Sequence, residues 1–176
     1  YGLIREQIID YLNVSVCYLY LGYLNHVLEE FEKGIELCKE FGNETDLTWL
    51  LRFYSMALIF TGNDKKAEKY IAEGIKIAQK FKNQTMLFRL IIINGLLFYL
   101  QNKSMELKGI LKTILQECEK KQNGLCIFLE GLYAVLTNSE EKTELIEKGL
   151  NLIAEEKDYP EYFLFLYFCG RYIPDI

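Results

Sequence analysis

A chain of 176 residues that is 51% hydrophobic and 14% aromatic has enough apolar surface to form a buried core, which excludes the disordered class of protein. The formal net charge is −5 and no run of Lys or Arg is longer than a pair, so the surface lacks the concentrated positive charge that nucleic-acid binding requires. We therefore expect no direct contact with nucleic acid.

Both prolines, Pro160 and Pro174, lie near the C-terminal end. Because proline breaks helices more strongly than any other residue, the long stretch before Pro160 predicts an all-α fold.

The composition also bears on metals and on the cell compartment. The chain has no Cys-x-x-Cys pair and a single histidine, His26, so we expect no zinc or other metal site. The N-terminus lacks the pattern of a secretory signal. We interpret the five cysteines as small core residues in a reducing compartment, which favours a cytoplasmic location. They are Cys17, Cys38, Cys118, Cys126 and Cys169.

The most apolar stretch of the chain runs from Met86 to Leu100 and contains Arg89 and Asn94. It is shorter than the ~20 residues that a membrane-spanning helix needs. We therefore expect no contact with a membrane and interpret this stretch as a helix that is buried on two sides within a stack.

Residues of the same type recur along the chain at a fixed interval of about 40 residues, which we call the repeat interval. Gly22 is followed by Gly62, and Asn102 takes the third place in this series. Because many independent positions agree on one interval, we predict a structural repeat of this length. The other series are Gly34 and Gly74; Phe41 and Phe81; Asn43, Asn83 and Asn123; Ile35, Ile75 and Leu115; and Cys38, Ala78 and Cys118.

The interval shortens after the third unit. Leu150 follows Leu115, and Asn138 follows Asn102, a few residues earlier than the repeat interval would place them. We predict a fourth unit with a short first helix at roughly 125–137 and a second helix at about 140–156. The prediction is a single domain over 1–176, with units at about 5–46, 47–86, 87–124 and 125–161 and a terminal helix at 162–173.

Each unit is predicted to be a pair of antiparallel helices. In the second helix of the second unit, apolar residues recur at steps of three and four from Ala67 to Ala78, and lysine and glutamate fill the opposite face. Asp64 and Ser104, again one repeat interval apart, are predicted to cap the N-termini of such helices, because their side-chain oxygens can accept from backbone N–H groups.

Glycines inside the second helices predict close contact between helices. Gly34, Gly74 and Gly149 each destabilise a helix by about 1 kcal/mol relative to alanine, and a repeated cost of this kind implies a packing reason. The first helices, 47–61 and 87–101, are apolar almost all the way round, so we expect each to be covered on more than one side.

These patterns resemble the tetratricopeptide repeat (TPR). The closest match is the turn Thr61-Gly62-Asn63-Asp64, followed by Ala67, Ile71 and Gly74 at the small and large packing positions of the second helix. The units are longer than the usual length of about 34 residues and lack the closing proline. They are similar to the long helical repeats of large bacterial and archaeal regulators. The resemblance covers about residues 5–160 and implies a right-handed superhelical stack of antiparallel helix hairpins, an α-solenoid.

The resemblance also implies a function and a surface. In such proteins a protein or peptide partner usually lies in the concave groove formed by the first helices. The chain would then be a non-catalytic interaction scaffold that serves as the sensing or partner-binding module of a larger regulator. This groove would be more apolar than those that bind a peptide carboxylate. Its residues would be Asn13, Val16 and Tyr20 in the first unit, Trp49, Arg52, Phe53 and Met56 in the second, and Arg89, Ile93, Leu96 and Tyr99 in the third.

The sequence offers no catalytic or cofactor motif. It contains no glycine-rich phosphate loop, no His-Glu-x-x-His and no Gly-x-Ser-x-Gly, so we expect neither enzymatic activity nor a cofactor.

Two interpretations of Arg52 and Arg89 remain open. Each can pair internally or extend to water, or the two can anchor an acidic partner. Trp49, the only tryptophan, is equally consistent with the hairpin core and with the groove.

The segment from Tyr162 to Cys169 is aromatic on every face. Soluble monomers rarely expose such a patch, so we expect either that the natural chain continues or that this segment pairs with another copy. The alternative function is accordingly a homo-oligomerisation module, such as a homodimer, that buries its apolar first helices and the aromatic segment.

Overall fold

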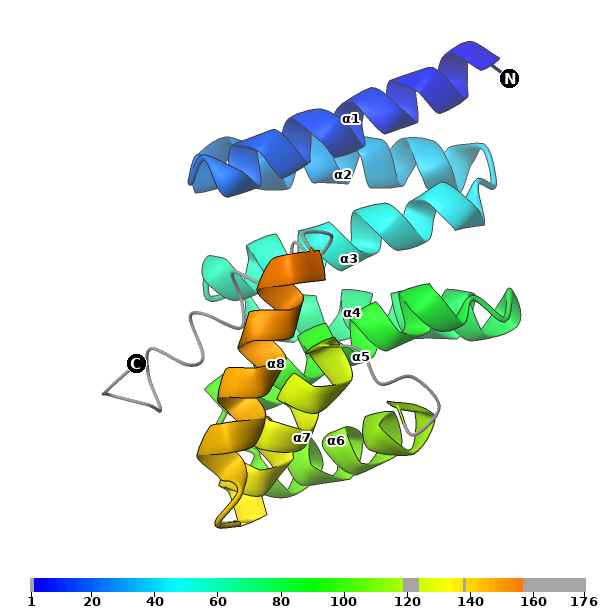
Figure 1. Cartoon of the computed structure of the whole chain (residues 1–176). Helices are drawn as coiled ribbons and strands as arrows, with labels where there is room; N and C mark the ends of the chain where they lie inside the picture. The colour runs from blue at the N-terminus through cyan, green and yellow to red at the C-terminus, as the bar shows by residue number, and fades with distance from the viewer. Residues whose placement is uncertain (1, 119–123, 138, 157–176) are drawn as a thin grey trace. The chain divides into compact units, whose positions relative to one another are not determined.

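The computed structural model describes residues 2–118, 124–137 and 139–156, and every regular element in these residues is an α-helix (Figure 1). The predicted all-α class is confirmed for this part of the chain. By contacts the chain divides into two compact units, 1–103 and 104–176. The helices are α1 (Gly2–Tyr20), α2 (Leu24–Glu40), α3 (Glu44–Phe60), α4 (Asp64–Lys80) and α5 (Gln84–Leu100) in the first unit, and α6 (Ser104–Cys118), α7 (Gly124–Thr137) and α8 (Lys142–Glu156) in the second.

The turns of the first unit recur at half the repeat interval found in the sequence. Each has three residues, and its middle residue has a positive φ of between 53° and 77°. The third residue donates its backbone N–H to the carbonyl five residues earlier, as Asn63 does to Leu58 at 2.8 Å. Each helix thus ends with a residue in the left-handed conformation, and this hydrogen bond satisfies one of the last carbonyl groups of the helix. The middle residues are Gly22, Gly42, Gly62, Lys82 and Asn102.

Asparagine caps place the helix starts earlier than predicted. The side chain of Asn43 accepts from the backbone N–H of Asp46 at 3.1 Å, and that of Asn83 accepts from Met86 at 3.0 Å. As a result α3 and α5 each begin three residues before the predicted first residue. The prediction that Asp64 and Ser104 are N-caps is wrong, because the three-residue turn makes each the first residue of its helix.

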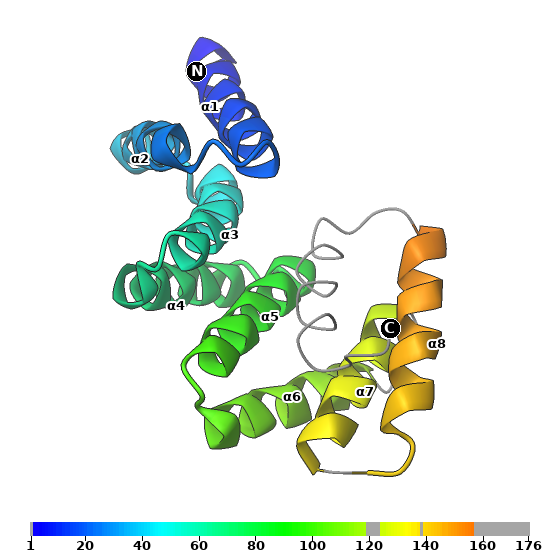
Figure 2. The same ribbon diagram turned by 90° about the vertical axis from the view of Figure 1, so that its left-hand side faces the viewer.

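In the first unit, consecutive helices pack as hairpins, and the first helices also pack on one another. Contacts join α1 to α3 and α3 to α5, in addition to each neighbouring pair from α1 to α5 (Figure 2). Consequently α3 is buried from Leu47 to Ile59 except for the half-buried Trp49. For α3, this burial confirms the expectation that a helix that is apolar all the way round is covered on more than one side.

The glycines inside α2 and α4 lie where helices approach closely, as predicted. A Cβ atom on Gly34 would lie 3.1 Å from the side chain of Leu50, and one on Gly74 would lie 3.0 Å from Leu90. Leu50 and Leu90 are themselves one repeat interval apart. The contact between glycine and leucine therefore recurs in space at the same interval at which the residue types recur in the sequence.

In the second unit, α7 packs against both α6 and α8. Helix α7 begins at Gly124 and α8 at Lys142, and both positions are within two residues of the predicted starts. The closest approach is between Gly131 and Ile146, where an added Cβ would lie 2.8 Å from a backbone nitrogen. The predicted terminal helix at 162–173 lies outside the described residues, and the predicted unit boundaries stay predictions.

The cysteines differ from the expectation that all five are reduced. Cys17 and Cys38 are free, and burial raises the pKa of the Cys38 thiol to about 12, so that thiol is protonated at neutral pH. Cys126 is buried in α7 and is disulfide-bonded, which corrects the interpretation for this residue. Sequence spacing cannot show such a pairing, because a disulfide depends on the distance between two residues in space.

Among the described helices, none is both long and apolar enough to cross a membrane.

Candidate functional site

Trp49 of α3 brings together the two arginines of the first helices. The guanidinium carbon of Arg52 lies 5.6 Å from the centre of the indole, and that of Arg89, from α5, lies 5.5 Å from it. Arg52 also lies 4.4 Å from the ring centre of Phe53. Guanidinium groups are attracted to the negative faces of aromatic rings, so the contact between Arg89 and Trp49 joins α5 to α3. We call Trp49, Arg52, Phe53 and Arg89 the tryptophan cluster.

The members of the tryptophan cluster differ in their access to solvent. Arg52 is completely buried and Phe53 is 6% exposed, whereas Trp49 and Arg89 are half-buried. A partner can therefore reach the indole and the second guanidinium directly. Arg52 contacts the same ring but is not accessible to a partner. The cluster therefore combines an aromatic ring with two positively charged guanidinium groups.

The other predicted groove residues lie at three different depths. Met56, Ile93 and Leu96 are buried in the core and are not accessible to a partner. Val16 and Tyr99 are half-buried, while Asn13 and Tyr20 are exposed on α1, which packs on α3. Whether these residues bind a partner stays a prediction.

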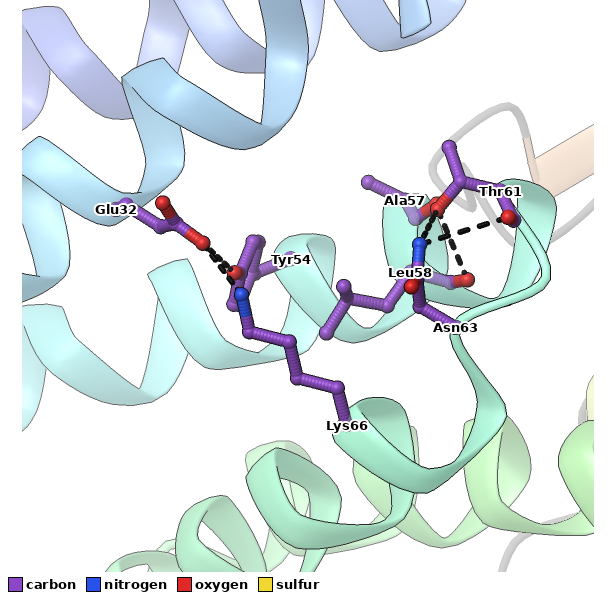
Figure 3. A network of polar contacts seen from close by, with 7 residues as sticks. All are labelled: Glu32, Tyr54, Ala57, Leu58, Thr61, Asn63 and Lys66. Atoms are coloured by element: carbon purple, nitrogen blue, oxygen red, sulfur yellow. Dashed lines mark hydrogen bonds and ion pairs between the residues drawn. The ribbon is translucent and has the colours of Figure 1, made fainter. Parts of the chain in front are cut away.

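A second polar cluster, which the sequence did not reveal, joins α2, α3 and α4 (Figure 3). The Tyr54 hydroxyl donates to the Glu32 carboxylate, and Lys66 Nζ donates to the same oxygen at 2.5 Å. The Tyr54 ring is fully buried, with its centre 5.9 Å from that of Phe31 and 5.0 Å from that of Tyr70. The only signal in the sequence was a tyrosine in an otherwise apolar helix, whose hydroxyl needs a partner when the ring is buried.

The charges of this second cluster stabilise one another. The hydrogen bond from Lys66 is the main reason that the pKa of Glu32 lies below its usual value. Burial, followed by the hydrogen bond to Glu32, raises the pKa of Tyr54, and the hydrogen bond to Glu32 raises that of Lys66. All three groups therefore keep their ordinary neutral-pH states, and the cluster is a structural bridge rather than an acid–base pair.

The turn after α3 shows how the repeat closes locally. Thr61 Oγ1 donates to the carbonyl of Ala57 at 2.9 Å, and Asn63 Nδ2 donates to Thr61 Oγ1 at 2.9 Å (Figure 3).

In the described residues, no three His, Cys, Asp or Glu side chains gather where they could hold a metal ion. The expectations that the chain needs no metal or cofactor and is not an enzyme stay predictions.

Comparison with known proteins gives a likeness of fold. No protein-family model matches the chain, and no curated protein matches it. Among solved structures, the chain is similar to the crystal structure of BtubC (BKLC) from P. vanneervenii, with a TM-score of 0.70 and 13% sequence identity. The match covers 86% of this chain and 65% of that one, so the chain spans less than two thirds of BtubC. The two chains share a helical fold.

Proposed function

We propose that this chain is a TPR-like α-solenoid that binds a protein or peptide partner through its first helices, as the sensing or partner-binding module of a larger regulator. The module is non-catalytic and acts by presenting side chains that packing already holds in place, so little conformational entropy is lost on binding.

The repeated contacts of the first unit support the solenoid. The pair Gly34 and Leu50 recurs as Gly74 and Leu90, so successive hairpins meet in the same way. The first helices pack laterally as well, from α1 to α3 and from α3 to α5. Stacking of identical hairpins through one recurring contact is what generates a superhelix with its first helices on the inner wall.

The tryptophan cluster is the observation that carries the binding proposal. A half-buried indole with two guanidinium groups within 6 Å of its ring centre combines an apolar contact surface with positive charge. Trp and Arg are the residues that most often dominate binding energy in interfaces. The partner that fits best is a peptide with an acidic side chain or terminal carboxylate beside an apolar residue.

The test uses the single tryptophan as its own reporter. The full chain would be screened against a displayed library of random peptides, and the enriched peptides would be titrated while the emission of Trp49 is recorded. We expect acidic peptides to be enriched and to shift the emission. We expect Arg89→Ala to weaken their binding by about tenfold or more, because a charge-assisted hydrogen bond is worth ~1.5–3 kcal/mol.

The matched control is Arg5→Ala, which removes an exposed arginine on α1 that pairs with Asp46 instead. This variant should bind the peptides as the wild type does. Arg52→Ala is less informative, because Arg52 is fully buried and its loss should also destabilise α3. Enriched peptides that bind the wild type and the Arg89→Ala variant equally, without changing Trp49 emission, would show that the tryptophan cluster is not the binding surface.

A further inference from the structure

Exposed apolar side chains gather on α1, which forms one end of the first unit (Figure 1). The described residues contain ten exposed large hydrophobic side chains, and six of them belong to α1 and the turn that follows it. Three of the six, Leu3, Val14 and Leu21, are 83%, 43% and 68% exposed. A soluble helix usually turns such residues towards a neighbouring helix, so this end of the unit has an apolar surface without a cover.

These three residues lie on one side of α1 together with three other exposed residues. Alternating steps of four and three residues connect them, and such steps return to the same side of a helix. Leu21 continues the helical path into the turn, because its N–H donates to the carbonyl of Cys17 at 3.0 Å. We call the six exposed residues at these steps the outer stripe of α1: Leu3, Gln7, Asp10, Val14, Cys17 and Leu21.

The equivalent stripe of α3 is buried. The turns after α1 and α3 each have a left-handed glycine, Gly22 and Gly62, so residues one repeat interval apart lie at the same distance before the turn. Four residues of the outer stripe have an equivalent within α3, and none of these equivalents is more than 4% exposed: Leu47 for Gln7, Leu50 for Asp10, Tyr54 for Val14 and Ala57 for Cys17.

The other side of α1 is covered in the same way as that of α3. Equivalent residues are buried in both helices there: Ile8 and Thr48, Ser15 and Ser55, and Leu19 and Ile59. The outer stripe of α1 therefore lacks a cover that the equivalent stripe of α3 has.

The second helices supply this cover in the repeat. An added Cβ on Gly34 of α2 would lie 3.1 Å from the side chain of Leu50 in α3 and 3.1 Å from that of Tyr11 in α1. One on Gly74 of α4 would lie 3.0 Å from the side chain of Leu90 in α5. Each second helix thus packs on the first helix that follows it, and a glycine contacts the position that is equivalent to Asp10 of α1.

We propose that the outer stripe of α1 binds an amphipathic helix of a partner protein, which lies on α1 as α2 lies on α3 and as α4 lies on α5. The partner helix runs antiparallel to α1, because a turn that reverses the chain joins each second helix to the first helix that it covers. It contacts Val14, Cys17 and Leu21 with apolar residues. This surface is separate from the tryptophan cluster, whose residues belong to α3 and α5.

The charge of Asp10 specifies one residue of the partner helix. Asp10 has a carboxylate where Leu50 and Leu90 have an apolar side chain, and it makes no hydrogen bond or ion pair with any described residue. Burial of an unpaired carboxylate is costly. The partner helix therefore has a lysine or an arginine, in place of the glycine of α2 and α4, opposite Asp10.

The same charge disfavours a second copy of the chain as the occupant. Parallel pairing of two outer stripes places Asp10 on Asp10, and antiparallel pairing about the middle of the stripe places Asp10 opposite Val14. Arg5 is the only basic residue of α1, and it pairs with Asp46. Neither arrangement pairs the carboxylate with a positive charge.

The experiment uses the chain's own α4 as the template for the probe. A labelled peptide of residues 64–80 would be held helical by a covalent link between its exposed positions 65 and 69, because an isolated helix of this length is marginally stable. One form has Gly74→Lys and the other has Gly74→Glu, at the position that would face Asp10. Fluorescence anisotropy would measure the binding of each form to the full chain.

We expect the lysine form to bind at least about tenfold more tightly than the glutamate form, because one pairs with Asp10 and the other repels it. In the Asp10→Lys variant the order of the two peptides should reverse. Asp10 is exposed and has no partner in the described residues, so this substitution should leave the fold intact. Val14→Asp should weaken the binding of both peptides, because it places a second charge in the apolar part of the stripe.

Two control variants separate this surface from others. Glu36→Lys makes the same change of charge as Asp10→Lys at an exposed position of α2, and it should bind the two peptides as the wild type does. Arg89→Ala should also bind them as the wild type does. A loss of binding in Arg89→Ala would instead place the peptides on the tryptophan cluster and overturn the proposal.

The proposal is also wrong if neither peptide binds, or if Asp10→Lys leaves their order unchanged. Sedimentation equilibrium of the chain without peptide tests the alternative occupant. A wild type that dimerises, together with a Val14→Asp variant that remains monomeric, would show that a second copy rather than a partner helix covers the outer stripe. Circular dichroism of each variant and peptide would confirm that its helices are intact.

Discussion

The two units bring helices together through glycine in different ways. In the first unit, the space beside Gly74 is limited by the side-chain methyl groups of Leu90, and the next contact is with Leu51. In the second unit, the space beside Gly131 is limited by the backbone nitrogen and Cα of Ile146 as well as by its side chain. A leucine side chain can move by a few tenths of an ångström, whereas a helix backbone can move only with its helix. The same residue type therefore sets a soft contact in one unit and a hard one in the other.

Gly131→Ala should have the largest effect. The new methyl group would overlap the backbone of α8, so α7 and α8 would have to separate and lose the packing of the buried Ile146. We expect a loss of about 3 kcal/mol in the free energy of unfolding, at the upper end of the usual cost of overpacking. Chemical denaturation would measure the loss, and hydrogen exchange would place it in α7 and α8.

Two further glycine variants sharpen this comparison. Gly74→Ala should cost only about 1 kcal/mol, because Leu90 can shift and alanine favours the helix. Gly109→Ala is the matched control in α6, where an added Cβ would meet nothing within 4 Å. It should stabilise the chain by up to ~1 kcal/mol. If Gly131→Ala and Gly74→Ala prove equally costly, the distinction between backbone and side-chain contact is wrong.

A smaller effect is expected at the turns. Lys82 has a φ of 53° at the position where Gly22, Gly42 and Gly62 have glycine. A left-handed conformation is unfavourable for a residue with a side chain, so Lys82→Gly should raise the free energy of unfolding by about 0.5–1 kcal/mol. The measurement is the denaturation midpoint.

The reciprocal change at an equivalent turn is Gly62→Ala, which places a methyl group at a φ of 74°. It should lower stability by about 1 kcal/mol. Since an added Cβ would meet nothing within 4 Å there, the loss would come from backbone conformation alone. A Lys82→Gly variant that is less stable than the wild type would instead show that the lysine side chain contributes at this turn.

The smallest effect concerns Glu32, whose pKa is lowered chiefly by Lys66. A carboxylate with a lower pKa in the folded state stabilises the fold above its unfolded pKa, and this contribution is lost as the pH falls below about 4.5 and through the lowered value. Both partners are partly exposed, so we expect less than about 1 kcal/mol at neutral pH. Glu32→Gln should be less stable than the wild type at pH 7 and equal to it in acid. A difference that does not change with pH would mean that shape rather than charge matters at this position.

The sequence alone determined the fold class, the repeat interval and the existence of close contacts at Gly34 and Gly74. These features can be predicted because they depend on residues close together in the sequence. The spacing of apolar residues indicates a helix, and glycine occurs where the backbone conformation or a close contact requires it. The sequence also placed both ends of α7 and α8 to within about two residues. It missed that the turns recur at half the repeat interval, because Lys82 takes the place of a glycine one repeat interval after Gly42.

Only the tertiary structure decided which residues meet across helices. It placed Arg89 and the buried Arg52 close to the ring of Trp49, and it joined Tyr54 and Lys66 to Glu32. It also set Gly131 against the backbone of α8. The physical reason is that such contacts depend on the distance and angle between two helix axes, which arise from the packing of all the side chains between them. No periodicity within a single helix contains that information.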